Sequence, residues 1–184
     1  MKAAPGGSNL RSILIEEEQA IAIPDEFERS FRAHHGMVFR TAYRITGNAA
    51  DAEDASQTVF LRLLHRSDSA EAVKSEESYL RRAAVNAALD ILRSRKSSPT
   101  VELMELPGEP SRNETAELRQ VLAQALGKLE PRSAEVFTLR FLEGFTNPQI
   151  ATMLGISQVL VAVIVHRARR QLQRELGAYL GDRS

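Results

Sequence analysis

Residues 144–176 read GFTNPQIATMLGISQVLVAVIVHRARRQLQREL, and this stretch decides the fold class. Thr146 can cap a short helix, and Gln149 three residues later completes a capping box. Gly155 can end that helix in a left-handed turn, and Ser157 can cap the longer helix that follows. A short helix, a glycine turn and a longer helix together predict a helix-turn-helix unit.

The longer helix has two contrasting faces. At about 100° per residue, one face is an apolar stripe that we expect to be buried, formed by Val161, Val165, Ala168 and Leu172. In a helix-turn-helix unit the second helix enters the DNA major groove, and guanidinium groups on its exposed face neutralise phosphates. The alternative is a solvated helix end whose arginines offset the helix dipole. We predict phosphate contact by Arg167, Arg170 and Arg174.

Helical periodicity also runs through the N-terminal half of the chain, where strand signals are nearly absent. One helix is predicted from about Asp25 to Gly47, a second opens at Asp51, and a third covers about residues 75–96. Residues 97–113 break the pattern with prolines, serines and glutamates, which predict a flexible acidic linker.

The chain is therefore predicted to be all-α, with two small helical domains over residues 25–96 and 114–178 and the linker between them. A loose tail, residues 1–24, is expected to contain one short helix around residues 11–22. The formal net charge of zero conceals a segregation: residues 31–96 carry +3 and residues 119–184 carry +4. Basic folded units beside acidic segments suit a protein that places two surfaces on a polyanion.

Composition excludes several classes of protein. The chain has no cysteine, which rules out disulfides and zinc–thiolate sites. Its four histidines lack metal-ligand spacing, and no glycine-rich loop could cradle a phosphate. No apolar run approaches the roughly 20 residues of a membrane span, and no secretory signal is recognised. We expect a cytoplasmic protein that is not an enzyme, is not inserted in a membrane, and uses no metal or other cofactor.

The C-terminal half resembles a known family. Segments 129–132 (LEPR), 137–141 (FTLRF), 143–146 (EGFT) and 166–169 (HRAR) resemble the −35-binding domain of extracytoplasmic-function (ECF) sigma factors, which are subunits of bacterial RNA polymerase. The resemblance covers about residues 25–178, because the N-terminal half matches the −10-binding domain of the same family.

For the N-terminal half, the resemblance implies two binding surfaces. Docking on the clamp helices of the polymerase β′ subunit is implied for Asp51, Glu53, Asp54, Gln57 and Phe60. Trapping of unpaired −10 bases is expected of the third helix, through Tyr79, Arg82, Asn86, Asp90 and Arg93. The latter five share one helix face and combine an aromatic, an amide and arginines, which suits single-stranded DNA.

Structural interpretations of these positions stay open. Tyr79 can be a half-buried core residue, and Asp90 can pair with a neighbouring arginine. The acidic cluster at residues 51–54 can be a helix N-terminus that favours negative charge.

The implied function is that of a sigma factor, which binds core RNA polymerase and directs promoter recognition, −10 melting and transcription initiation. Its implied partners are the β′ clamp helices and β flap of the polymerase, promoter DNA and, as a further candidate, an anti-sigma factor. The acidic linker is expected to occupy the basic channel for template and nascent RNA.

One departure from the family lies in the recognition helix, whose first two turns contain Val159, Leu160, Ala162, Val163 and Ile164. Apolar side chains cannot form bidentate hydrogen bonds with bases. Direct −35 readout then falls to Ser157, Gln158 and His166, or is replaced by phosphate contact and DNA shape. An apolar patch also suits a protein contact. Two alternatives are therefore kept: a sigma mimic that sequesters an anti-sigma protein, and a stand-alone helix-turn-helix regulator.

Overall fold

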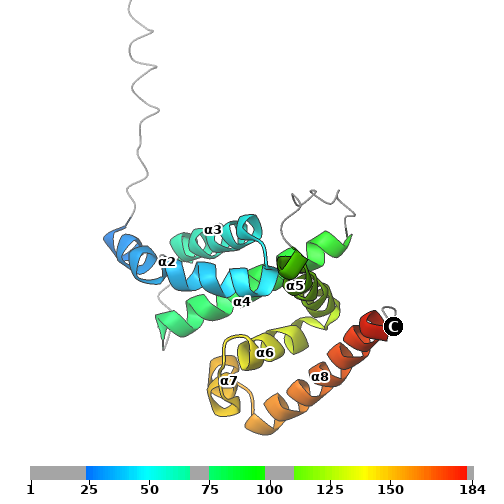
Figure 1. Cartoon of the computed structure of the whole chain (residues 1–184). Helices are drawn as coiled ribbons and strands as arrows, with labels where there is room; N and C mark the ends of the chain where they lie inside the picture. Colours follow the sequence, from blue (N-terminus) through cyan, green and yellow to red (C-terminus); the bar gives the residue numbers. More distant parts are fainter. Residues whose placement is uncertain (1–23, 67–74, 98–109, 182–184) are drawn as a thin grey trace, which may run out of the picture.

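The computed structural model describes residues 24–66, 75–97 and 110–181, and all regular structure in these ranges is helical. The helices are α2 (Asp25–Thr46), α3 (Ala49–Arg66), α4 (Glu76–Ser97), α5 (Pro110–Lys128), α6 (Pro131–Phe141), α7 (Asn147–Leu154) and α8 (Gln158–Gly181) (Figure 1). The predicted all-α class is confirmed. The helix expected around residues 11–22 and most of the predicted linker lie outside the described residues.

The predicted helix ends are confirmed by the backbone. Gly47 and Gly155 both have positive φ, 68° and 65°, the left-handed conformation that glycine adopts at little cost. The capping box of α7 is present, with Thr146 and Gln149 each accepting a hydrogen bond from the backbone amide of the other. The Ser157 hydroxyl accepts from the amide of Leu160 at 3.2 Å and so caps α8.

The start of α5 differs from the sequence-based boundary. The helix begins at Pro110, inside the segment predicted as linker, whereas the second domain was expected from residue 114. Proline suits the first position of a helix because its φ is already helical and the amide hydrogen it lacks has no partner there. Pro110 therefore marks the start of a helix within the segment that was predicted as linker.

Helices α2, α3 and α4 form an N-terminal unit around a small apolar core. Val38 and Ile45 of α2, Val59 of α3, and Leu80 and Leu89 of α4 are at most 2% exposed. Alanines fill the positions between them, including Ala52 and Ala55 on α3 and Ala84 and Ala88 on α4, all fully buried. Small side chains let the three helix axes approach closely.

Helices α5 to α8 form a C-terminal unit. Its fully buried side chains include Leu126, Leu139, Ile150 and Val161. The predicted stripe of α8 is confirmed, because Val161, Ala168 and Leu172 are at most 3% exposed and Val165 is half-buried. No single helix among those described is both long enough and apolar enough to cross a membrane; α7 and α8 reach that threshold only as a pair with a 107° bend.

The two units are joined along α4, which lies between the α2–α3 pair and the C-terminal helices (Figure 1). The buried apolar residues of both units form one continuous cluster. At the α4–α5 contact, a β-carbon added to Gly127 would lie 3.4 Å from the carbonyl oxygen of Leu92. Glycine thus allows these two helices to pack with their backbones close together.

Candidate nucleic-acid interface

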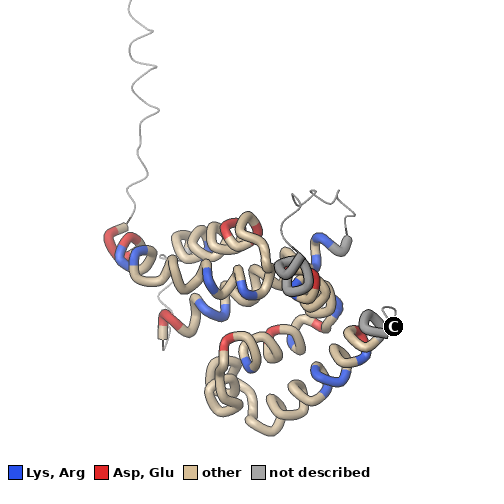
Figure 2. Tube along the Cα trace, in the orientation of Figure 1, with Lys and Arg blue, Asp and Glu red and all other residues tan. Residues whose placement is uncertain are grey.

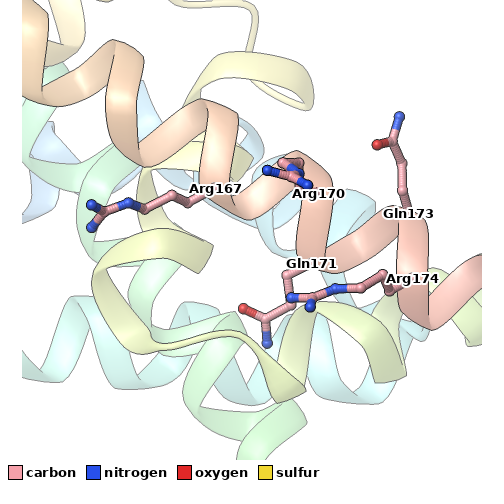
Figure 3. A pocket seen from close by; sticks show the side chains of 5 residues that line it. All are labelled: Arg167, Arg170, Gln171, Gln173 and Arg174. Carbon is pink, nitrogen blue, oxygen red and sulfur yellow. The ribbon is translucent and has the colours of Figure 1, made fainter.

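Three arginines extend from successive turns of α8, and we call Arg167, Arg170 and Arg174 the arginine row (Figure 3). All three are exposed, and they line a shallow hollow together with Gln171 and Gln173. Among the residues that the structure describes, none of the three forms an ion pair with an acidic side chain. The arginine row therefore presents uncompensated positive charge on a helix surface, which is what a phosphate backbone requires.

The first turns of α8 have a different character. Val159 is 74% exposed, Leu160 44% and Val163 39%. Among the predicted base-reading residues, Gln158 and His166 are exposed, whereas Ser157 already uses its hydroxyl oxygen to cap the helix. The predicted apolar surface at the start of the recognition helix is confirmed, and the polar groups left to read base edges are few.

The acidic cluster of α3 divides into exposed and buried residues. Glu53, Asp54 and Gln57 are exposed and lie within two turns of one helix. Asp51 is 5% exposed, and one of its carboxylate oxygens accepts a hydrogen bond from Arg95 of α4 at 2.5 Å. Burial raises the pKa of the Asp51 carboxyl, although the nearby Arg95 opposes this.

Phe60, the fifth predicted docking residue, is also buried. Its ring lies 4.7 Å from that of Phe31 and 6.3 Å from that of Phe27, in edge-on contacts between α3 and α2. Of the predicted docking set, three side chains therefore form a surface, and Asp51 and Phe60 pack beneath it.

The predicted −10-binding side chains of α4 lie together, and we call Tyr79, Arg82, Asn86, Asp90 and Arg93 the α4 DNA face. Arg93 donates to Asp90 at 2.9 Å, which is the pairing that the structural alternative for Asp90 described. Tyr79 is half-buried against the core, as its structural interpretation anticipated.

Part of the α4 DNA face is covered by the C-terminal unit. Glu135 of α6 accepts from Arg82 Nε at 2.6 Å and from Asn86 Nδ2 at 3.0 Å. Its other oxygen accepts from Arg132, one turn away on α6. The Glu135 side chain is only 5% exposed, so this carboxylate is held almost entirely by donors of the protein.

A second carboxylate makes a similar contact. Glu143 has no exposed side-chain surface, and it accepts hydrogen bonds from Thr41, Arg44 and Arg81 at 3.0, 2.7 and 2.8 Å. Figure 2 shows basic positions along α4 and acidic positions on the neighbouring α6 region. We call Glu135 and Glu143 the carboxylate clasp.

Sequence reasoning did not single out the carboxylate clasp. Glu143 belongs to the EGFT segment, and Glu135 lies on the buried side of α6, where an acidic side chain requires a partner. That requirement is the signal by which Glu135 could have been found. The identity of the partners, 49 to 102 residues away in sequence, has no local signature.

Both halves of the chain match family models: "Sigma-70 region 2" over residues 30–98 and "Sigma-70, region 4" over residues 119–172. The RNA polymerase sigma-E factor of Streptomyces coelicolor is 32% identical over 155 residues, which cover 83% of this chain and 87% of the relative. The ECF RNA polymerase sigma factor SigL of Mycobacterium tuberculosis is 31% identical over 153 residues, 78% of this chain and 86% of the relative.

Two solved structures with a similar fold are complexes with a second protein. CnrH in complex with the cytosolic domain of CnrY has a TM-score of 0.54 and 28% identity, over 83% of this chain and 88% of that chain. The sigma factor RpoE of Bartonella quintana, in complex with the anti-sigma factor NepR, has a TM-score of 0.51 over 84% of this chain and 98% of that chain. At 21% identity, this second likeness concerns the fold alone.

Proposed function

Because this chain belongs to the ECF sigma factors, which bind core RNA polymerase and direct promoter recognition and transcription initiation, we propose how its two helical units divide that work. The N-terminal unit binds the polymerase and the −10 element, and the C-terminal unit binds the −35 element. The observation that carries this division is the arginine row on α8, an exposed cationic surface in a helix-turn-helix unit with no acidic partner among the described residues.

The polymerase surface is proposed to be the exposed part of α3. Glu53, Asp54 and Gln57 offer two carboxylates and an amide to the clamp helices of the β′ subunit. Asp51 and Phe60 support this surface from beneath through Arg95 and the α2 aromatic rings. In this arrangement only the three exposed residues contact the polymerase directly.

The −10 strand is proposed to bind along α4. The ring of Tyr79 offers a stacking surface, Arg82 and Arg93 offer positive charge, and Asn86 and Asp90 can hydrogen-bond base edges. Melting of the duplex then follows from the capture of unpaired bases, because a base that the protein holds can no longer pair with its complement.

The −35 duplex is proposed to bind along α8. The arginine row contacts phosphates and sets the position of the helix in the groove, while Gln158 and His166 contact base edges. Val159, Leu160 and Val163 can contact thymine methyl groups, so A·T-rich −35 sequences are favoured over G·C-rich ones. The C-terminal unit also contacts the β flap.

Core polymerase acts in the cytoplasm, so the chain is proposed to act there as well. The decisive experiment is run-off transcription from genomic fragments with purified core polymerase. The complete chain should direct initiation from a defined set of start sites that core enzyme alone does not use. If no start site is selected although the chain co-elutes with core enzyme, the mimic is favoured. The exposed Val159, Leu160 and Val163 would then be its protein-binding surface.

A further inference from the structure

Three aliphatic side chains are exposed at the start of α8, and we call Val159, Leu160 and Val163 the apolar patch. Their exposed fractions are 74%, 44% and 39%. Single exposed aliphatic residues are common on protein surfaces, whereas three on neighbouring turns of one helix form a contiguous patch, which is typical of a binding surface.

The apolar patch continues the face of α8 that carries the arginine row. At about 100° per residue, Val159, Val163 and Arg170 fall within about 40° of one another around the helix. Leu160 and Arg167 lie about 20° apart on one flank of the same face. The proposed contact of the arginines with phosphates places the apolar patch in the major groove, where the first turns of a recognition helix meet base edges. This continuity indicates DNA as the partner of the patch.

Several polar side chains of the helix-turn-helix unit are already engaged within the protein. Ser157 caps α8, and Thr146 and Gln149 form the capping box of α7. The hydroxyl of Thr152 donates to the carbonyl oxygen of Pro148 at 3.1 Å. Few hydrogen-bonding groups are therefore left to read bases, and apolar contact becomes a main source of discrimination.

In the major groove, the only alkyl group on a base edge is the C5-methyl group of thymine. Valine suits contact with it, because β-branching fixes one rotamer in a helix and little side-chain entropy remains to be lost. Aliphatic carbon forms no hydrogen bond with the O4 acceptor of thymine or the N4 donor of cytosine. A 5-methylcytosine carries its methyl group at the same ring position as thymine, so it offers the apolar patch the same contact.

We propose that the apolar patch recognises the C5-methyl group of pyrimidines in the −35 duplex, whichever base carries it, so that methylation of cytosine within this element strengthens binding. The inference rests on the proposed function, because it concerns the specificity and the regulation of the −35 site. The −35 element is then read as a pattern of methyl groups between phosphates that the arginine row holds.

Chemically altered duplexes test the methyl contact. The probe carries the −35 sequence mapped by run-off transcription, and fluorescence anisotropy measures its dissociation constant. Uracil in place of one thymine at a time removes a methyl group and keeps the hydrogen-bonding edge. At each contacted position the constant should rise about fourfold, as expected when one methyl group loses its apolar contact. A C·G pair at the same position should bind more weakly than T·A, and 5-methylcytosine in that pair should recover about fourfold in affinity.

Substitutions in the apolar patch test the protein side. Val159→Ala and Val163→Ala should each lose the preference for thymine over uracil at the position that the valine contacts, while affinity for the uracil duplex changes little. Any effect of uracil on DNA shape is the same for both chains, so the double-mutant cycle isolates the contact itself. Leu61→Ala on α3 is the matched control, because Leu61 is a 56% exposed aliphatic side chain outside the patch. This variant should keep the full preference.

The outcomes separate this inference from the proposed function. Equal affinities for thymine and uracil duplexes, in a chain that directs run-off transcription, would overturn the inference alone and leave the apolar patch to a protein partner. A thymine preference that persists in both valine variants would also overturn it, because the methyl group would then act through DNA shape. If the chain binds no duplex and directs no transcription, the proposed function fails and the inference fails with it. A methyl preference that depends on the valines supports both.

Discussion

Asp51 illustrates how a single residue can serve the fold beneath a surface that we propose to bind the polymerase. Its carboxylate is 7% exposed and faces Arg95, which belongs to a different helix. Burial raises the pKa of Asp51, and the attraction of Arg95 only partly offsets this effect. Asp51 therefore links α3 to α4, and the free-energy cost of burying its carboxylate depends on Arg95 and on pH.

Replacing Arg95 with alanine should expose that cost. The buried carboxylate loses its countercharge, and the free energy of unfolding at pH 7 should fall by about 1–2 kcal/mol in urea titrations. Adding Asp51→Asn to this variant should recover part of the loss, because the amide carries no charge. A double variant less stable than Arg95→Ala would show that Asp51 does not carry a burial penalty.

The same residue predicts a pH dependence with a definite sign. A carboxyl whose pKa is raised in the folded chain binds its proton more tightly there than in the unfolded chain, where the value is near 3.8. The stability of the natural chain relative to Asp51→Asn should therefore increase as pH falls through the raised pKa and level off below the unfolded value. Unfolding measured from pH 7 to pH 3 on both chains checks the direction.

At the level of helices, α8 combines an apolar start with a cationic end, and the two parts should respond differently to mutation. The arginine row is assigned to phosphates, which carry no sequence information. Substituting Arg167 and Arg170 with alanine should weaken binding to all −35 duplexes alike. The slope of log K against log salt should flatten by about 0.9 for each phosphate that the protein no longer neutralises.

Fluorescence anisotropy with duplexes of different −35 sequence, at several salt concentrations, measures both effects. Arg62→Ala on α3 is the control for loss of an exposed arginine, and it should change neither affinity nor slope. A change of sequence preference in the Arg167 and Arg170 variant would mean that these side chains contact bases.

Helix α3 offers a comparable test on the polymerase side. Asp54 is exposed and can be reversed in charge without disturbing the core. Asp54→Arg should abolish co-elution with core polymerase through like-charge contact, whereas Glu26→Arg, an equal change in the first turn of α2, should not. Co-elution of the Asp54→Arg chain would remove α3 from the polymerase surface. Circular dichroism of both variants verifies that the helices are retained.

At the scale of the whole molecule, local sequence patterns predicted where the helices lie. The packing of the helices on one another depends on long-range contacts that such patterns do not reveal. Gly47, Thr146, Gly155 and Ser157 act on neighbours within four residues, so their turns and caps could be recognised from the sequence. The burial of Asp51 depends on Arg95, 44 residues away. The α4 DNA face was identified from helical periodicity, but periodicity shows only which side chains share a face and not what covers that face.

The continuous core that joins the two units leads to a prediction for folding. Since α4 packs on both sides, the units should unfold together, and calorimetry should show one transition whose van't Hoff and calorimetric enthalpies agree. Gly127→Val places methyl groups against the Leu92 carbonyl, where even a β-carbon lies at 3.4 Å, and should separate the transition into two. Gly177→Val on α8, where a β-carbon meets no atom within 4 Å, is the matched control and should preserve a single transition. Two transitions in the natural chain would mean that α4 does not couple the units, and that the helices of each unit are stable without the other.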